Sequence, residues 1–164
     1  MITIGILSDT HIQTASDAFT QNCQIAFSDC NVIIHAGDLT DSSILSVFKG
    51  KEVHAVYGNS CNRSTQISLP REKLISLGGF TIGISHGAGS RHNIEERVFD
   101  LFPEADCIVY GHSHIPVCHT VGGTLMMNPG SFQGTGPYGA AGSYGIIKID
   151  QHGLQGSLHT ISTL

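Results

Sequence analysis

The stretch "ITIGILSDTH" (Ile2–His11) runs from a block of mostly apolar residues directly into four polar ones. A continuous, isoleucine-rich block of this length predicts a strand over 2–7 that is covered on both faces. The stretch "NVIIHAGD" (31–38) repeats the same plan. Between the two, apolar residues recur with helical spacing over 19–27, behind the plausible capping residue Ser16. The start of the chain therefore predicts a strand–helix–strand unit.

The rest of the chain continues this alternation. Gly78-Gly79 and Gly122-Gly123 each separate two β-rich runs, which predicts two hairpins with tight turns. The full set is a short helix after Asp41, strands over 52–57, 107–110 and 143–150, hairpins over 73–87 and 117–127, and a helix over 94–102 that ends at Pro103. We expect a single α/β domain over residues 1–164, a layered α-β-β-α sandwich with two mixed β-sheets flanked by helices. The glycine-rich stretch 130–143 is expected to be a mobile loop.

Composition and charge narrow the function classes. The net charge is −5 and the Lys and Arg residues are dispersed, so no basic stripe is available to follow a nucleic-acid backbone. Five cysteines without a CxxC pair predict reduced, mostly buried thiols, as in cytosolic proteins. An early carboxylate at Asp9 and the lack of an 18-residue apolar window predict no signal peptide, no membrane segment and a cytoplasmic location.

Side chains of the types that bind metal ions follow the ends of the predicted strands. Open α/β sheets bind ligands beyond the carboxyl ends of their strands, so we expect these donors to lie close together. Each one alone is as well explained as a turn or capping residue. Together, unpaired carboxylates and imidazoles in one cleft require a compensating cation. The donors are Asp9, His11, Asp38, Asn59, His86, His112 and His114.

The chemistry of this donor set indicates which ions fit. Seven donors are too many for one tetrahedral zinc ion but suit two ions if one carboxylate bridges them. Asp38, which follows a glycine, is the candidate bridge. Because no cysteine takes part, the site suits Mn²⁺, Fe²⁺, Zn²⁺ or Ni²⁺ held by nitrogen and oxygen atoms. We expect two divalent ions per chain, with Mn²⁺ as the first candidate.

Six short motifs also occur in a fixed order: "DTH" (9–11), "GD" (37–38), "GN" (58–59), "SHG" (85–87), "GHSH" (111–114) and "NPGS" (128–131). In this order they resemble the calcineurin-like metallophosphoesterases, and more narrowly the small single-domain bacterial and archaeal phosphodiesterases of that superfamily. The resemblance implies one ion on Asp9, His11, Asp38 and His114, and a second on Asp38, Asn59, His86 and His112. The two histidines of "GHSH" would then serve different ions.

The resemblance also implies a reaction. A metal-bridging hydroxide would attack phosphorus in line with the leaving oxygen of a small phosphodiester, while both ions offset the charge on the phosphate. No protein nucleophile is needed. Asp38, Asn59 and His112 are the expected catalytic residues, and Asn59 is also expected to contact the substrate.

Two departures from the family pattern bear on the substrate. Where relatives carry "GNH" followed by an acidic residue, or "GNCD", this chain reads "GNSCN" (58–62), which offers no strong general acid. General-acid help is worth about 10²–10⁴-fold, so its absence favours good leaving groups or protonation by water or another residue. The loop after "NPGS" lacks an arginine that relatives often show. Arg63 or Arg91 could supply a cation instead, and Arg91 is our candidate substrate contact.

Other polar residues receive structural interpretations. His35 is predicted to be a buried, hydrogen-bonded residue of the core or of the layer behind the ligands. His54 is expected to pack in a sheet, and Cys61 to be an inert thiol because no base is predicted beside it. Asn128 and Ser131 are expected to shape the cleft floor.

Two classes of function remain. One is the phosphodiesterase, with a phosphomonoesterase or nucleotidase as its nearest variants. The other is a non-catalytic interaction scaffold, because one eukaryotic relative of this fold is a retromer scaffold subunit. The scaffold predicts decayed ligands, whereas all seven positions are intact here. The net negative charge of the chain disfavours a nuclease, because long nucleic acids are polyanions. Exposed edges of the hairpins would permit a homo-oligomer.

Overall fold

The computed structural model describes residues 1–134 and 141–162. In chain order the elements of this part are β1 (Ile2–Leu7), α1 (Asp17–Ala26), β2 (Val32–His35), the 3₁₀ helix η1 (Ser42–Phe48), β3 (Glu52–Ala55), α2 (Arg63–Ser68), β4 (Glu72–Leu77), β5 (Phe80–Ser85), α3 (Ile94–Leu101), β6 (Cys107–Val109), β7 (Val117–Val121), β8 (Thr124–Asn128), β9 (Ser143–Asp150) and β10 (Gly153–Thr160).

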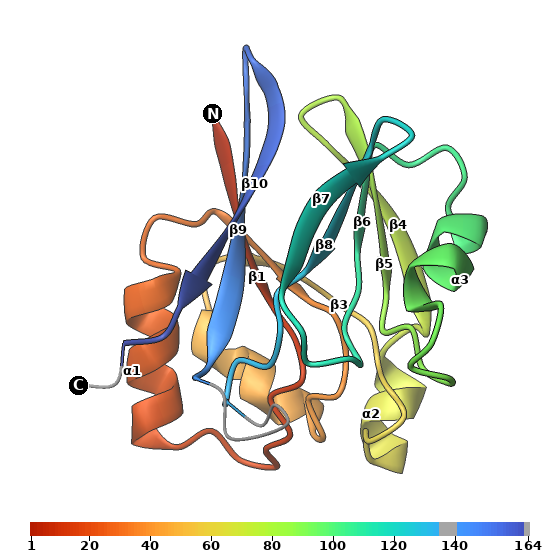
Figure 1. Ribbon diagram of the computed structural model, residues 1–164. Helices are drawn as coiled ribbons and strands as arrows, with labels where there is room; N and C mark the ends of the chain where they lie inside the picture. The colour runs from red at the N-terminus through yellow and green to blue at the C-terminus, as the bar shows by residue number, and fades with distance from the viewer. Residues whose placement is uncertain (135–140, 163–164) are drawn as a thin grey trace.

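Two five-stranded sheets face each other, and helices cover their outer faces (Figure 1). The first sheet has the order β10-β9-β1-β2-β3, with α1 and η1 outside it. The second has the order β4-β5-β6-β8-β7, with α3 outside it. Each sheet mixes parallel pairs, such as β1 with β2 and β5 with β6, with antiparallel ones. The predicted α-β-β-α sandwich is therefore confirmed.

The core explains why the central strands have continuous apolar sequences. Ile4 and Ile6 of β1 belong to the cluster between the sheets, whereas Leu7 belongs to the cluster beneath α1 and η1. On the other side of the molecule, Val98 of α3 and Phe102, the residue after α3, pack onto the second sheet. Because both faces of the central strands are covered, neither face needs polar residues.

The predicted helix caps and hairpins are confirmed. Ser16 accepts a hydrogen bond from the Phe19 backbone N–H at 3.1 Å, which satisfies one of the free N–H groups at the start of α1. Asp41 caps η1 through the Ser43 backbone N–H. Both Gly-Gly pairs form two-residue turns, between β4 and β5 and between β7 and β8.

Two elements are not apparent from the sequence pattern. Helix α2 has the polar sequence RSTQIS and buries only Thr65, so it has no apolar stripe to reveal it. Strand β10 is an edge strand paired only with β9, and it contains two glycines and no run of apolar residues. The predicted strand over 52–57 ends earlier, at Ala55, because the Tyr57 N–H bonds the carbonyl of Pro70 outside the sheet.

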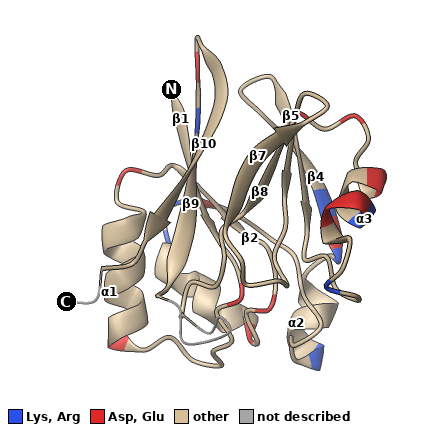
Figure 2. Cartoon of the chain, viewed as in Figure 1, with Lys and Arg blue, Asp and Glu red and all other residues tan. Residues whose placement is uncertain are grey.

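The distribution of charged residues and the burial of the cysteines agree with the predictions drawn from the sequence. The view in Figure 2 shows no continuous stripe of Lys and Arg over the described elements. All five cysteines are free, and four of them are buried, as predicted. No helix of the described chain has the length and apolar character needed to span a bilayer. The expected mobile loop over 130–143 falls partly on residues 135–140, which lie outside the described residues.

Candidate metal centre

The predicted ligands come from loops at one edge of the sandwich, where parallel strands of both sheets end. β1, β2 and β3 are parallel in the first sheet, and β5 and β6 are parallel in the second. The loops after these strands bring two groups of donors together. Ligand atoms lie within 4.8 Å of one another in the group Asp9, His11 and His114 and in the group Asp38, His86 and His112.

The Asp9 carboxylate lies between the two groups. Its Oδ1 is 3.1 Å from Nε2 of His114, 3.6 Å from Nε2 of His11 and 3.8 Å from Nε2 of His86. The whole residue is buried, and within the described chain no donor is aligned for a hydrogen bond to Oδ1. A buried carboxylate oxygen without a donor is costly unless a cation lies beside it.

The other oxygen of Asp9 is fully engaged. Oδ2 accepts hydrogen bonds from the Ser8 hydroxyl at 2.7 Å and from the His112 backbone N–H at 3.1 Å. Burial acts to raise the pKa of Asp9, but the nearby imidazoles of His11 and His114 and the Ser8 hydroxyl outweigh it and hold that pKa well below its usual range. Asp9 is therefore ionised, with one oxygen free to face a cation.

His86 also presents an unpaired atom to the centre. Its Nδ1–H donates to the backbone carbonyl of Ala36 at 2.8 Å, so in the neutral ring Nε2 carries the lone pair. That Nε2 is buried and unpaired within the described residues, and it faces Oδ2 of Asp38 at 3.1 Å. Burial acts to lower the pKa of His86, but the carboxylates of Asp38 and Asp9 outweigh it and raise the pKa. Either a proton or a metal ion relieves the repulsion between these two acceptors.

One carboxylate oxygen of Asp38 accepts a backbone hydrogen bond, and the other faces both donor groups. Oδ1 accepts the Ser60 backbone N–H at 2.8 Å. Oδ2 faces His86, and it also lies 3.9 Å from Nε2 of His11 in the other group. Burial acts to raise the pKa of Asp38, but His86 and the Ser60 N–H lower it below its usual value. A single carboxylate oxygen between the two groups has the position that a bridging ligand needs.

His112 is oriented by a loop that helix α3 holds in place. Its Nε2–H donates to the Gly89 carbonyl at 2.8 Å, which leaves Nδ1 as the nitrogen with a lone pair. The guanidinium of Arg97 donates to the carbonyls on either side, those of Gly87, Ala88 and Ser90. The orientation of His112 therefore depends on a helix that carries no ligand.

The backbone is strained at five of the predicted metal ligands. Outside glycine, the described chain has seven residues with positive φ, and five of them are predicted ligands. A left-handed conformation is uncommon for non-glycine residues and persists only where the surrounding structure enforces it, often at functional sites. The five are Asp9 (φ 54°), His11 (50°), Asp38 (55°), His112 (70°) and His114 (61°).

Two glycines make room for the carboxylates. A Cβ on Gly111 would lie 2.1 Å from the Ser8 Oγ and 2.8 Å from Oδ2 of Asp9. A Cβ on Gly58 would lie 2.2 Å from Oδ1 of Asp38. The close backbone approach expected at Gly111 is therefore confirmed, because any larger residue would displace Asp9 or its hydrogen-bond partner.

Three buried residues tie the ligand loops together. His35 accepts the Gly37 N–H on Nδ1 at 3.2 Å, so its Nε2–H donates to Thr10 Oγ1 at 3.1 Å, and the ring joins the loops after β1 and β2. The side-chain amide of Asn128 donates to the Gly111 carbonyl at 2.9 Å. The Ser131 hydroxyl donates to the backbone carbonyl of Asp9 at 2.9 Å. The predicted burial and hydrogen bonding of His35 are confirmed, and Asn128 and Ser131 bond the ligand loops from buried positions.

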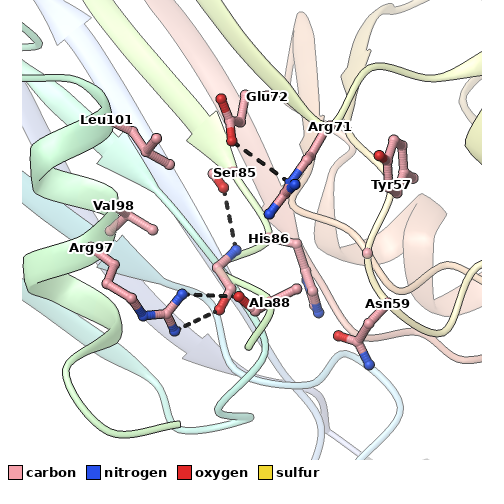
Figure 3. Close-up of a pocket in the computed structure, with 12 residues that line it drawn as sticks. Tyr57, Asn59, Arg71, Glu72, Ser85, His86, Ala88, Arg97, Val98 and Leu101 are labelled. Carbon is pink, nitrogen blue, oxygen red and sulfur yellow. Dashed lines mark hydrogen bonds and ion pairs between the residues drawn. The ribbon is translucent and has the colours of Figure 1, made fainter. Parts of the chain in front are cut away.

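The remaining predicted site residues lie around the centre. Asn59 is exposed, and its side chain lies beside the imidazole of His86 (Figure 3). Arg91 is exposed in the segment before α3. Burial, the charge of His86 and the charge of Arg91 together lower the pKa of His112, so Arg91 acts electrostatically on the centre. Arg63 is the exposed first residue of α2.

Sequence reasoning did not identify Ser8 and Arg97 as supporting residues. Ser8 precedes the motif "DTH", so its adjacency to a ligand is a signal that could have indicated it. Arg97 is one of several charged residues on an amphipathic helix, and nothing in the sequence distinguishes it from a solvated one.

His54 and Cys61 lie apart from the two donor groups. His54 contacts Glu52 within β3, at 2.7 Å from Nε2 to Oε1. Cys61 is buried, and its sulfur accepts the Gly58 N–H at 3.3 Å. Both placements agree with the structural interpretations drawn from the sequence.

Comparison with known proteins identifies the family. Residues 2–152 match the model of the calcineurin-like phosphoesterase superfamily domain. The chain is 34% identical over 131 residues to a probable metallophosphoesterase of Methanothermobacter thermautotrophicus, covering 78% of this chain and 76% of the relative. Among solved structures it is similar to a novel archaeal phosphodiesterase (TM-score 0.71, 23% identity, 96% of this chain and 100% of the other). It is also similar in fold to Vps29 of Entamoeba histolytica complexed with Zn²⁺ (TM-score 0.73, 18% identity, 98% and 100%). The chain thus belongs to the calcineurin-like phosphoesterase superfamily.

Proposed function

We propose that this protein is a dinuclear metal-dependent phosphodiesterase that hydrolyses a small phosphodiester. The observation that carries the proposal is the pair of buried, unpaired acceptors, Oδ1 of Asp9 and Nε2 of His86, which come one from each donor group and lie 3.8 Å apart. Two facing acceptors without a donor fit cations placed on either side of them.

The donor set fits two divalent ions with nitrogen and oxygen ligands. In this proposal His11 and His114 hold the first ion together with Asp9, and His86 and His112 hold the second. Asp38 bridges, since its Oδ2 faces both groups, and the amide of Asn59 completes the second set. The absence of cysteine from both groups favours Mn²⁺, with Fe²⁺, Zn²⁺ or Ni²⁺ as alternatives. Bound there, such ions lower the pKa of water and offset the negative charge of a phosphate.

The residues of the chain orient the reaction. Hydrogen bonds donated by the rings of His86 and His112 to the carbonyls of Ala36 and Gly89 fix the ring tautomers, so both rings present a lone pair to the centre. Asp38, Asn59 and His112 are the proposed catalytic residues, and Asn59 and Arg91 are the proposed contacts to the substrate phosphate. We propose that residues 1–164 form a single metallophosphoesterase domain.

The test is turnover of bis(p-nitrophenyl) phosphate by Mn²⁺-reconstituted protein, beside the corresponding monoester. Wild-type protein is expected to hydrolyse the diester, and Asp38→Asn and His112→Ala are each expected to abolish it. Asp100→Asn and His152→Ala are matched controls, because both residues are exposed and lie outside the donor groups. Activity that survives both site substitutions would contradict the site assignment, and a preference for the monoester would favour a phosphomonoesterase.

The interaction scaffold is the second candidate, because the fold is shared with Vps29 proteins. Metal binding cannot separate the two, since the Vps29 of Entamoeba histolytica is described as complexed with Zn²⁺. Turnover does separate them. Two bound ions per chain without turnover of any diester would favour the scaffold.

A further inference from the structure

A cavity of about 170 Å³ opens beside the second donor group, and none of the α3 residues that line it is a predicted metal ligand. Figure 3 shows His86 and Asn59 at one end of the cavity and the α3 residues Val98 and Leu101 at the other. Arg71, just before β4, reaches over it between them. A group bonded to a phosphorus at the metal centre would extend into this space.

The cavity carries excess positive charge. Arg71 and Arg97 both line it, against the one carboxylate of Glu72. Arg97 is bound only by backbone carbonyls in the described chain, and its Nε is buried without a partner, so no carboxylate there neutralises it. The pair between Arg71 and Glu72 is exposed, with 3.8 Å between Nε and Oε1, and such surface pairs are weak. Arg71 is therefore free to exchange Glu72 for an anionic ligand.

No acid beside Asn59 can protonate a leaving oxygen. Cys61 is buried, and its sulfur accepts the Gly58 N–H. Asn62 caps α2, since its Oδ1 accepts the Thr65 N–H at 2.8 Å while its Nδ2 donates to Asp41. Ser60 offers only a hydroxyl. A leaving group that needs no proton is the one this segment suits.

We propose that this cavity is the leaving-group subsite and that the leaving group carries a phosphate, so that the substrate class is a phosphoanhydride between two organic phosphates. The inference rests on the proposed phosphodiesterase function. In the reaction, the oxygen of water forms a bond to one phosphorus, and the bridging oxygen leaves the same phosphorus with its electron pair. One proton of the water is released to solvent. The departing phosphate monoester has a second pKa of about 6, so it leaves at neutral pH without being protonated. Arg71 binds its charge.

The test compares two substrates that share the attacked group. Thymidine 5′-(p-nitrophenyl phosphate) releases nitrophenolate, and dithymidine diphosphate, an anhydride of two thymidine monophosphates, releases a nucleotide. For Mn²⁺-loaded Arg71→Met we expect the KM for the anhydride to rise about 10- to 100-fold, as for one lost hydrogen bond to a charged group. The KM for the nitrophenyl ester should change less than about 2-fold, and Arg71→Lys should recover part of the loss. Lys49→Met removes an exposed charge outside the cavity and should leave both substrates unaffected.

Binding of the non-hydrolysable methylene analogue of the anhydride gives a readout that does not depend on turnover. By calorimetry its Kd should rise by a similar factor in Arg71→Met and stay unchanged in Lys49→Met. Hydrolysis of the nitrophenyl ester with no hydrolysis of the anhydride, or equal effects of Arg71→Met on both substrates, would overturn the subsite and leave the phosphodiesterase intact. Hydrolysis of neither substrate by wild-type protein would overturn the phosphodiesterase, and the subsite with it.

Discussion

Nε2 of His86 lies 3.1 Å from Oδ2 of Asp38, while Nδ1 of the same ring is held by the Ala36 carbonyl at 2.8 Å. The ring cannot turn its N–H toward Asp38 without losing the bond to Ala36. A neutral His86 therefore presents a lone pair to a carboxylate, an arrangement that a bound cation stabilises. The predictions below follow from this and related contacts.

The two donor groups should bind ions separately. We expect two Mn²⁺ per wild-type chain after equilibrium dialysis, measured by elemental analysis. His114→Ala and His112→Ala should each retain one ion, because each removes a ligand from a different group. His152→Ala should retain both. Loss of both ions in either site variant would show that the groups act as one site.

Removal of metal should destabilise the fold. Two sites at free ion concentrations of 100 times Kd stabilise the native state by about 5 kcal/mol in total. For a chain of this size the Tm measured by calorimetry should fall by about 10–20 °C on adding a chelator. In a His112→Ala/His114→Ala double variant the chelator should change Tm little. An equal fall in that variant would place the bound metal elsewhere.

Once the metal has been removed with a chelator, His35 should make the free energy of unfolding fall as the pH is lowered into mild acid. Burial lowers the pKa of His35 to about 3, against a reference value of 6.5, so below pH 6.5 the unfolded chain binds a proton that the folded chain excludes. This contribution to stability is complete above pH 6.5 and is lost toward pH 3, by at most about 1.4 kcal/mol per pH unit. The neighbouring charges of Asp9, His86, Asp38 and His11 also act on the ring.

The measurement is urea denaturation from pH 7 to pH 4.5 for wild type and His35→Gln. Glutamine cannot be protonated, so the stability difference between the two proteins should shrink as the pH falls. Because the neighbouring groups are common to both proteins, their own titrations largely cancel in this difference. A difference that stays constant with pH would mean that His35 is not held neutral.

Gly111→Ala should damage the centre without altering a ligand. The new Cβ would meet the Ser8 Oγ and Oδ2 of Asp9, both buried, and overpacking of this kind costs about 1–3 kcal/mol. We expect a lower Tm and a weaker first ion. Gly145→Ala is the matched control, since its Cβ would meet the flexible end of Met127 at 3.1 Å and the Cβ of Ile6 at 3.4 Å, and neither residue is a ligand. Unchanged metal affinity in Gly111→Ala would contradict the packing argument.

Ser16→Ala should separate stability from function. The hydroxyl caps α1 and belongs to neither donor group, so its loss should cost about 0.5–2 kcal/mol of unfolding free energy. Metal stoichiometry and turnover at 25 °C should be unchanged. A loss of bound metal would show that α1 supports the centre.

Strands and hairpins were predictable where burial or turn chemistry left a local pattern. β1 and β2 are mostly apolar because helices cover one face and the second sheet covers the other. The Gly-Gly turns follow from the positive φ that both residues of each turn adopt. Helix α2 and strand β10 were not predictable, because neither has a continuous run or a helical stripe of apolar residues, and β10 is defined by its pairing with β9.

The sequence by itself determined the two-sheet α/β fold, the seven donors and the order of the motifs, because strand burial and metal-type side chains are properties of local stretches. Only the tertiary structure decided that Asp9 and His86 present unpaired atoms to each other, that Gly89 and Ala36 fix the histidine tautomers, and that Arg97 holds the loop behind His112. These features depend on distances between residues up to about a hundred positions apart along the chain, as between Asp9 and His112. No local pattern of side chains records such distances, since they arise when the ends of parallel strands from two sheets meet.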